Sequence, residues 1–374
     1  MNSDDLKYKM ALAQIPGLGP VNAKNLISYC GGIKEIFNTS EKKLLKTPGI
    51  GKITARSIIQ SKQLPEDFTD EIKFITKNNI QFHFYLDNDY PFLLKQCPDA
   101  PLFFFKKGTI SSFDNRKIIS VVGTRNATQR GKEICKNLIK ELSESGHNPI
   151  IISGLAFGID ICAHKAALKY GLETVSVLAH GFDRIYPAKH KNTASEITKQ
   201  GALITEFTKG SKFERQNFLR RNRIIAGLSH ASIIIESAAK GGSLVTADIA
   251  NSYNRDVFAV PGRLDDKYSE GTNWLIKIHK AFLLQSAKDI EYILNWEQNI
   301  NPKQQVLFVE LSEDEKKIAE ILQTNSKAVI DYICKESGFN SAKTSALLLE
   351  MEFKNAVRCL PGKVFELTGN INIK

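Results

Sequence analysis

Short apolar runs alternate with amphipathic segments along residues 117–295, and this alternation is the most regular pattern in the chain. Runs such as Ile118–Val122 and Ile233–Ile235 are apolar at every position, which is typical of strands buried on both faces. Segments such as 129–145 and 158–170 carry apolar residues at helical spacing. The expected strands are 117–123, 148–154, 173–180, 202–206, 231–237, 256–262 and 281–286. Because strands alternate with helices, we expect an α/β fold with an extended Rossmann-like parallel sheet over 117–295.

The first 70 residues show short helical stretches joined by glycine turns instead. The similar turns Ile15–Pro20 (IPGLGP) and Thr47–Lys52 (TPGIGK) each precede a helical stretch, which predicts two copies of one small unit. These turns resemble helix-hairpin-helix motifs and indicate a SAM-like helical domain over residues 1–70.

Turns of this kind can present backbone N–H groups to a DNA phosphate. Gly49, Gly51 and Lys52 are therefore candidate phosphate contacts, whereas Pro20 removes a donor from the first turn. A purely structural module explains the same glycines equally well, so the sequence leaves both interpretations open.

Two segments are expected to connect domains. Residues 71–116 form a mixed connector in this interpretation, because Pro91, Pro98 and Pro101 interrupt any long element. Residues 296–312, which contain Asn, Gln and Pro, are expected to form a linker.

Residues 313–374 predict a small winged-helix domain. Its expected elements are helices at 313–323, 327–337 and 341–352, followed by a hairpin that turns at Pro361–Gly362. This region holds 9 basic and 9 acidic residues, so its net charge gives no electrostatic reason to bind nucleic acid.

The positive charge of the protein lies in the other regions. The net charge is +11, with 10 basic against 7 acidic residues in 1–70 and 32 against 24 in 71–312. A basic balance of this size favours a polyanionic partner, although charge alone does not name it.

The sequence favours a cytoplasmic protein without a metal site or a membrane anchor. The six cysteines are scattered with no C-x-x-C pair, and the seven histidines are dispersed. No apolar run reaches the roughly 18 residues that span a bilayer, and the first residues lack the pattern of a signal peptide.

Small and polar residues recur where the expected strands end, which is where open parallel sheets bind ligands. Glycine lets backbone N–H groups approach an anion closely, and a following helix N-terminus attracts negative charge. The candidate phosphate contacts are Gly123, Thr124, Arg125, Ser153, Gly154, Lys240, Gly241, Gly242, Ser243 and Thr246. Tight strand-to-helix turns alone explain one such glycine cluster, but several at one sheet edge favour phosphate binding.

Segment 206–223 (EFTKGSKFERQNFLRRNR) is the most basic stretch, with six basic and two acidic residues. Phe213 and Phe218 lie among these charges, and an exposed ring can stack on an unpaired base. Its candidate nucleic-acid contacts are Lys212, Arg215, Phe218, Arg221, Asn222 and Arg223. The competing interpretation is a solvated helix face whose rings lie in the core.

No cofactor and no catalytic pair are indicated. The chain has neither a G-x-x-x-x-G-K-[ST] motif nor a G-x-G-x-x-G motif after its first expected strand. Acidic residues such as Asp160, Glu206, Glu236 and Asp248 form no recognisable catalytic pair in the sequence.

Taken together, these segments resemble the DNA-processing protein DprA (Smf) family over nearly the whole chain. The strings that carry the resemblance are VVGTR at 121–125, SGLAFGID at 153–160, AHGFDRIYP at 179–187, NFLRRNRIIAGLS at 217–229, GGSLVTA at 241–247 and FAVPG at 258–262. Two positions depart from the family pattern: Leu219 replaces a common proline, and Gly241 replaces a common serine.

The resemblance implies a homodimeric protein that binds single-stranded DNA without sequence preference. It also implies protection of incoming strands and loading of the recombinase RecA during natural transformation. By position, Arg125 resembles the pocket arginine of the family, Arg215 its common lysine, and Gly241–Ser243 its phosphate-contacting turn.

Two other functions compete with a non-enzymatic DNA-binding protein. A nucleotide hydrolase of the phosphoribohydrolase kind would use a similar sheet edge, but AKGGSLVTAD at 239–248 lacks the glutamate of the P-G-G-x-G-T-x-x-E pattern. A protein-interaction adaptor would use the neutral winged helix as its contact surface.

Overall fold

The computed structural model describes residues 3–296, 311–325, 327–354, 356–360 and 363–368. The chain divides into two compact units, residues 1–299 and 300–374, which are described separately.

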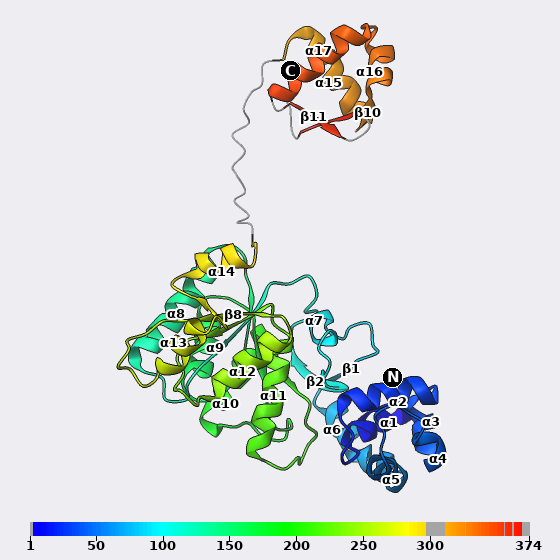
Figure 1. Cartoon of the computed structure of the whole chain (residues 1–374), viewed down its shortest axis with the longest axis vertical. Helices are drawn as coiled ribbons and strands as arrows, with labels where there is room; N and C mark the ends of the chain where they lie inside the picture. Colours follow the sequence, from blue (N-terminus) through cyan, green and yellow to red (C-terminus); the bar gives the residue numbers. More distant parts are fainter. Residues whose placement is uncertain (1–2, 297–310, 326, 355, 361–362, 369–374) are drawn as a thin grey trace. The chain divides into compact units, whose positions relative to one another are not determined.

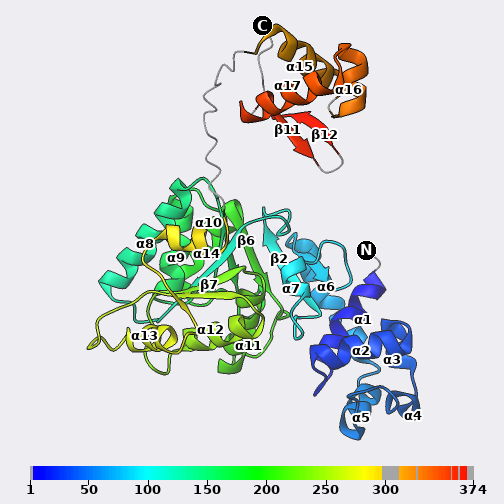
Figure 2. The same cartoon turned by 45° about the horizontal axis from the view of Figure 1, so that its top comes forward.

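The first unit is built on a nine-stranded sheet of order β1-β2-β6-β5-β4-β3-β7-β8-β9 (Figures 1 and 2). The seven parallel strands are β3 (Ile118–Val122), β4 (Ile150–Ser153), β5 (Thr174–Val177), β6 (Gly201–Thr205), β7 (Ala231–Ile234), β8 (Asp256–Ala259) and β9 (Phe282–Leu283). Six of them fall within a strand expected from the sequence, and β6 begins one residue before the expected strand 202–206, so the Rossmann-like parallel sheet is confirmed.

The expected connector over 71–116 is wrong in one respect, because it contributes two strands to this sheet. Strand β1 (Gln81–Phe84) pairs with β2 (Phe103–Gly108), and β2 pairs with β6, in both cases antiparallel. The prolines that suggested a connector lie in the loop between these strands, where they interrupt no ladder. The sheet is therefore parallel in its main part and antiparallel at one edge.

Helices cover both faces of the sheet, as the pattern predicts. On one face, α8 (Gln129–Glu144), α9 (Ile159–Lys169) and α14 (Ala287–Ile293) share a core with apolar side chains of β3, β4, β7 and β8. On the other face, α11 (Arg215–Gly227), α12 (Gly242–Ser252) and α7 (Phe92–Lys95) bury a second cluster. The remaining helices are α10 (Lys191–Gln200) and α13 (Glu270–Lys277).

The N-terminal helices pack against the two antiparallel strands rather than forming an isolated domain. They are α1 (Ser3–Gln14), α2 (Pro20–Cys30), α3 (Ile33–Asn38), α4 (Glu41–Leu44), α5 (Lys52–Gln60), the 3-10 helix Leu64–Phe68 and α6 (Thr69–Lys77). Their apolar core is continuous with Phe82, Phe103 and Phe105 of β1 and β2. A hydrogen bond also reaches the loop after β6, because the Glu71 carboxylate accepts the Lys209 N–H at 3.0 Å.

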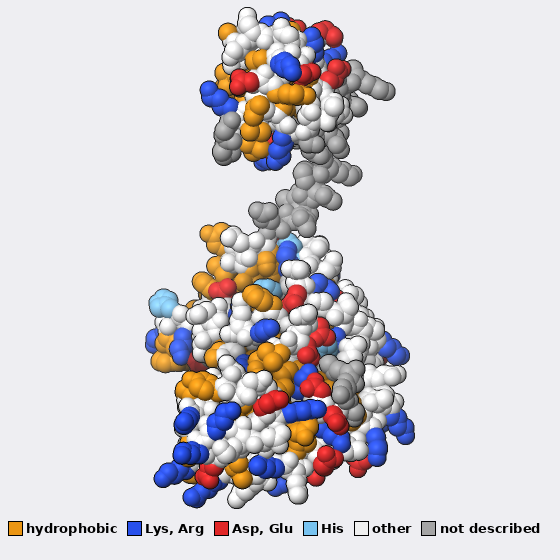
Figure 3. Space-filling view, turned by 90° about the vertical axis from the view of Figure 1, so that its right-hand side faces the viewer, with side chains coloured by type: hydrophobic (Ala, Val, Ile, Leu, Met, Phe, Trp, Pro, Cys, Tyr) orange, Lys and Arg blue, Asp and Glu red, His pale blue; other side chains and the backbone are white. Residues whose placement is uncertain are grey.

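The second unit has the three helices and the small sheet of a winged helix. Its elements are α15 (Glu313–Asn325), β10 (Ala328–Val329), α16 (Ile330–Ser337), α17 (Ser341–Phe353), β11 (Val357–Leu360) and β12 (Val364–Leu367), with strand order β10-β12-β11. Figure 3 shows basic, acidic and hydrophobic side chains mixed on one face of this unit. The turn expected at Pro361–Gly362, and most of the linker expected over 296–312, lie outside the described residues.

Two features are absent from the described ranges, a membrane-spanning helix and a cluster of metal ligands. No helix there is both long and apolar enough to cross a bilayer. No three His, Cys, Asp or Glu side chains in those ranges gather as metal ligands would.

Candidate nucleic-acid interface

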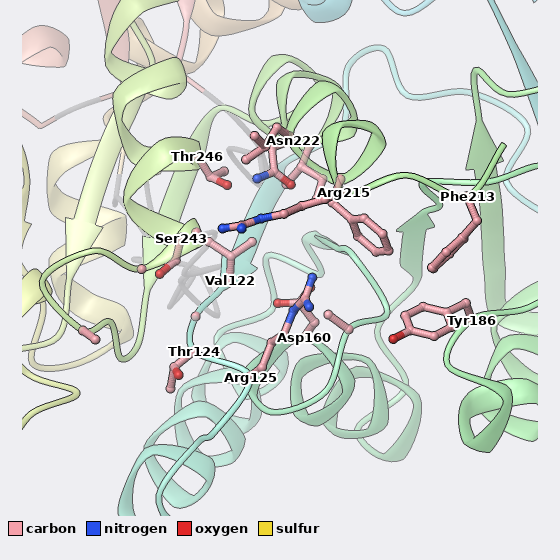
Figure 4. A pocket seen from close by; sticks show the side chains of 18 residues that line it. Val122, Thr124, Arg125, Asp160, Tyr186, Phe213, Arg215, Asn222, Ser243 and Thr246 are labelled. Atoms are coloured by element: carbon pink, nitrogen blue, oxygen red, sulfur yellow. The ribbon is translucent and has the colours of Figure 1, made fainter.

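A pocket of about 490 Å³ opens where the strand order of the sheet reverses. The chain leaves β3 toward β4, β5 and β6 on one side, and then returns to β7 on the other side of β3. The loops after β3 and β7 therefore diverge, and open α/β sheets bind ligands in the crevice this creates. Figure 4 shows the pocket with side chains that converge from several of these loops and helices.

Ten of the candidate residues line this pocket, although they come from three separate segments of the chain. They are Gly123, Thr124, Arg125, Arg215, Phe218, Asn222, Gly241, Gly242, Ser243 and Thr246. The loop after β3 supplies the first three and helix α12 with its preceding loop supplies the last four. Helix α11 supplies the others, and its lining residues recur at helical spacing on one face.

The N-terminus of α12 offers an anion site on one wall of the pocket. Ser243 lies in the first turn of this helix, and its hydroxyl is buried with no hydrogen-bond partner in the described part of the chain. The residue is only 6% exposed. A buried polar group without a partner is costly, and a helix N-terminus favours negative charge. An oxyanion at this position would satisfy the hydroxyl and the helix dipole together.

Two arginines face the same cavity without an ion pair to a described carboxylate, although the Arg125 charge acts on the nearby Asp160. Arg125 and Arg215 are both exposed, and neither forms an ion pair with a carboxylate of the described residues. Figure 4 shows both side chains extending into the pocket, Arg125 from the loop after β3 and Arg215 from the start of α11. The guanidinium carbon of Arg125 lies 5.2 Å from the centroid of the Phe218 ring, within the range of a cation–π contact. Both charges are therefore available to a ligand anion.

One carboxyl group, Asp160 at the start of α9, lies in the wall of the pocket. Burial raises the pKa of this carboxyl, while the Arg221 charge and the Ala156 N–H act in the opposite direction. Burial likewise lowers the pKa of the Arg221 guanidinium to about 10, and Asp160 opposes that change. The opposite charges of these two buried side chains thus stabilise each other.

Four candidate residues have structural roles, which corrects the sequence-based assignment. Ser153 is buried and donates its hydroxyl hydrogen to the Val121 carbonyl at 2.6 Å. A Cβ at Gly154 would collide with the Arg221 guanidinium, which itself donates to the Val177 carbonyl. The roles of this glycine and this arginine are therefore internal packing and hydrogen bonding.

Arg223 is the fourth of these residues. Its guanidinium is buried and contacts the Glu206 carboxylate at 2.5 Å. The number of basic residues in the segment could not distinguish the buried Arg221 and Arg223 from the pocket-lining Arg215, because it does not show which face of the helix is buried. Helical spacing from Arg215 through Phe218 to Asn222 was the signal that distinguishes them.

The other candidates lie outside this pocket. Lys212 and Lys240 are exposed on the loops before α11 and α12, and neither is among the lining residues. Gly51 is the N-cap of α5, and Gly49 and Lys52 lie beside it. These three residues line neither this pocket nor the next one, so their role as phosphate contacts stays a prediction.

The first glycine turn, rather than the second, lies beside the sheet domain. Residues 15–20 line a second cavity of about 840 Å³ together with Arg220 and Val245 of helices α11 and α12. Leu219 lines both cavities, so the two hollows adjoin across helix α11.

Two aromatic residues that were not among the selected contacts form the opposite rim of the pocket. Tyr186 and Phe213 are 42% and 43% exposed, and their ring centroids lie 4.6 Å apart. Figure 4 shows the two rings on the side of the pocket away from Ser243. Both residues lie in segments that the sequence singled out: Tyr186 in the AHGFDRIYP string at 179–187, and Phe213 in the basic segment 206–223.

Comparisons with known proteins agree with this architecture. The family model of DNA recombination-mediator protein A matches residues 81–295. A model of the SAM-like helix-hairpin-helix tandem matches residues 9–61, and a model of the DprA winged helix domain matches residues 308–363.

Individual relatives extend the agreement. Protein Smf of Synechocystis is 35% identical over 72% of this chain and 68% of its own length. DNA processing protein DprA of Bacillus subtilis is 41% identical over 54% of this chain and 67% of its own length.

Two solved structures are also similar. The X-ray structure of DNA processing protein A from Streptococcus pneumoniae matches with a TM-score of 0.64 and 28% identity, over 76% of this chain and 97% of that chain. A structure of its counterpart from Helicobacter pylori, which concerns the single-stranded DNA binding mode of that protein, matches with a TM-score of 0.52 and 29% identity. That match covers 59% of this chain and 98% of the Helicobacter chain. Family models, relatives and architecture agree, and the chain belongs to the DNA recombination-mediator protein A family.

Proposed function

We propose that this protein binds single-stranded DNA in the pocket at the strand-order reversal, without sequence preference. The observation that carries the proposal is the convergence in a single cavity of two arginines that form no ion pair among the described residues and one buried hydroxyl without a hydrogen-bond partner there. These groups suit the phosphates of a polynucleotide, because cations neutralise the backbone and a helix N-terminus accepts an oxyanion. The Helicobacter pylori relative, whose structure concerns single-stranded DNA binding, supports the assignment.

The chemistry of the lining favours an unpaired strand. Phosphate contacts carry no sequence information, and aromatic rings stack on any base. Rings at the rim are usable only when the base is not already paired and stacked within a duplex. The pocket would therefore bind the backbone phosphates of one strand, with the bases of that strand facing the aromatic rings.

In this proposal the protein acts as a homodimer. Support comes from exposed apolar side chains in the edge strand β9 and in the segments that precede it along the chain. Leu264 in the loop after β8 is 94% exposed, and Trp274 of α13 is 53% exposed. Phe282 and Leu283 of β9 are exposed on the same sheet edge. An exposed strand edge with apolar side chains is a ready surface for pairing, and a second copy would cover it symmetrically.

Loading of the recombinase RecA during natural transformation, in the cytoplasm, completes the proposed role. Membership of the family is its support, together with relatives named as DNA processing proteins. RecA polymerisation on single strands, measured with and without this protein, tests that step. A rate that is the same in both cases would contradict it.

A nucleotide hydrolase is the competing proposal, since the pocket also suits a nucleotide phosphate. Asp160 is the carboxyl among the described lining residues, and the charges of Arg221 and Arg125 favour its ionised form. Release of a free base from nucleoside monophosphates would support hydrolysis.

The test of the leading proposal compares oligo-dT with a duplex of the same length by fluorescence anisotropy. We expect tighter binding to the single strand and an affinity that falls as salt rises. Equal or tighter binding to the duplex would contradict the proposal.

A further inference from the structure

The rim of the pocket carries two aromatic rings that the fold does not need for its core. Tyr186 lies in the loop after β5 and Phe213 in the loop before α11, yet the rings pack edge to face at an interplanar angle of 62°. Both line the pocket, and both keep about two fifths of their surface exposed. Clustered exposed aromatic side chains beside a pocket mark binding surfaces more than single exposed residues do.

Phe218, the ring that the sequence singled out, has less free surface. It is half-buried, and the Arg125 guanidinium lies over its ring. Phe213 meets it at an interplanar angle of 88°, with 5.5 Å between the ring centroids. Phe218 therefore supports Arg125 and Phe213, while the rings with the most free surface are Phe213 and Tyr186.

The loop that carries Phe213 is held in place by polar contacts at both ends. The Glu71 carboxylate accepts the Lys209 N–H, and the Asn217 side-chain amide donates to the Lys212 carbonyl at 2.7 Å. Within the loop, the Ser211 hydroxyl donates to the Thr208 carbonyl at 2.7 Å. Fixed rings bind more tightly than mobile ones, because less conformational freedom is lost when the ligand arrives.

The positions of the rings complement those of the anion-binding groups. In Figure 4 the Ser243 and Arg215 side chains lie on one side of the cavity, and Tyr186 and Phe213 lie on the other, with the tyrosine hydroxyl directed inward. A nucleotide has the same division, with a charged phosphate at one end and a flat apolar base at the other. The cavity between the two sides is about 490 Å³.

We infer that Tyr186 and Phe213 form a nucleobase-binding site, distinct from the phosphate contacts at Arg125, Arg215 and Ser243. The inference rests on the proposed binding of single-stranded DNA and deepens it. One unpaired base stacks on the exposed faces of these two rings while its phosphate meets the arginines. Because every base has an aromatic face, the site adds affinity without sequence preference.

The test separates bases from phosphates by using two ligands of equal length, oligo-dT and an abasic deoxyribose-phosphate strand. The variants are Tyr186→Leu, Phe213→Leu and the double variant, which keep apolar volume but remove the rings. Phe92→Leu serves as a matched control, because Phe92 is an exposed phenylalanine on α7 that does not line the pocket. Tyr186→Phe keeps the ring and removes the hydroxyl.

We expect the double variant to bind oligo-dT about 5- to 150-fold more weakly, which is the effect of losing one stacked base. Its affinity for the abasic strand and its salt dependence should stay unchanged, as should both affinities of the Phe92→Leu control. Tyr186→Phe should retain most of the affinity for oligo-dT. Thermal unfolding of each variant checks that the fold is intact.

Two results would overturn the nucleobase site while leaving DNA binding in place. One is a double variant that binds oligo-dT as tightly as the wild type, and the other is an equal loss of affinity for both strands. Failure of the wild-type protein to bind either strand would instead contradict the proposed function itself.

Discussion

Replacement of Arg125 and Arg215 by alanine tests whether the pocket neutralises phosphates. Each side chain is exposed, faces the cavity and forms no ion pair with a described carboxylate, so its charge is available to DNA. On single strands each neutralised phosphate adds about 0.7 to the slope of log affinity against log salt. If each arginine neutralises one phosphate, the double variant should lose about 1.4 from that slope.

The same relation gives the expected loss of affinity. Each variant should bind oligo-dT about 8-fold more weakly at about 50 mM salt, and about 3-fold more weakly at about 200 mM salt. For the double variant the losses are about 60-fold and about 10-fold. Fluorescence anisotropy titrations over a series of salt concentrations measure both the affinity and the slope.

A matched control removes one positive charge elsewhere. Lys169 lies in the last turn of α9, about 15 Å along the helix from its pocket end, and is exposed. Lys169→Ala should leave the slope and the affinity nearly unchanged. An unchanged slope in the arginine double variant, or an equal change in the lysine control, would refute a local phosphate site.

Three further predictions concern stability, assembly and the second unit. Burial lowers the pKa of the His164 side chain to about 3, whereas its pKa in the unfolded chain is about 6.5. The folded protein therefore keeps this ring neutral, so its free energy of unfolding is highest above pH 6.5 and falls as the pH drops toward 3. When the pH falls from 7 to 5, the free energy of unfolding should decrease by about 2 kcal/mol more in the wild type than in His164→Gln, as measured by urea denaturation. Equal decreases in the two proteins would show that His164 does not link stability to pH. Trp274→Asp should convert the dimer into a monomer in sedimentation equilibrium. Its thermal stability should change little, because the Trp274 side chain is half exposed. A variant that stays dimeric would show that Trp274 does not lie in the dimer interface. Deletion of residues 313–374 should leave oligo-dT affinity nearly intact, and a large loss would place DNA contacts on the winged helix.

Much of the fold was predictable because its strands are apolar at every position. Ile118–Val122 and Ile233–Ile235 have few alternatives to a buried parallel strand, and the structure places both at the centre of the sheet. Strands β1 and β2 were missed because they are short and separated by a proline-rich loop. Their place depends on pairing with β6, about 100 residues farther along the chain, which local pattern does not reveal.

The candidate site was predictable where a local sequence pattern, such as a strand-to-helix turn, by itself determines where its residues lie in the fold. Gly241–Ser243 lies at a strand-to-helix turn, and such turns reach the same sheet edge in any parallel sheet. Arg221 was misassigned because its charge is compensated by Asp160 and by a carbonyl of β5, both distant in sequence. The role of Tyr186 depends on meeting Phe213, 27 positions away and in a different loop, so only the folded chain brings the two together.

The most direct test of the account is a crystal structure of the full chain bound to a short oligo-dT. The account predicts a backbone phosphate between the guanidinium groups of Arg125 and Arg215, with one oxygen within hydrogen-bond distance of the Ser243 hydroxyl. A strand bound elsewhere on the protein, with this pocket left to solvent, would contradict it.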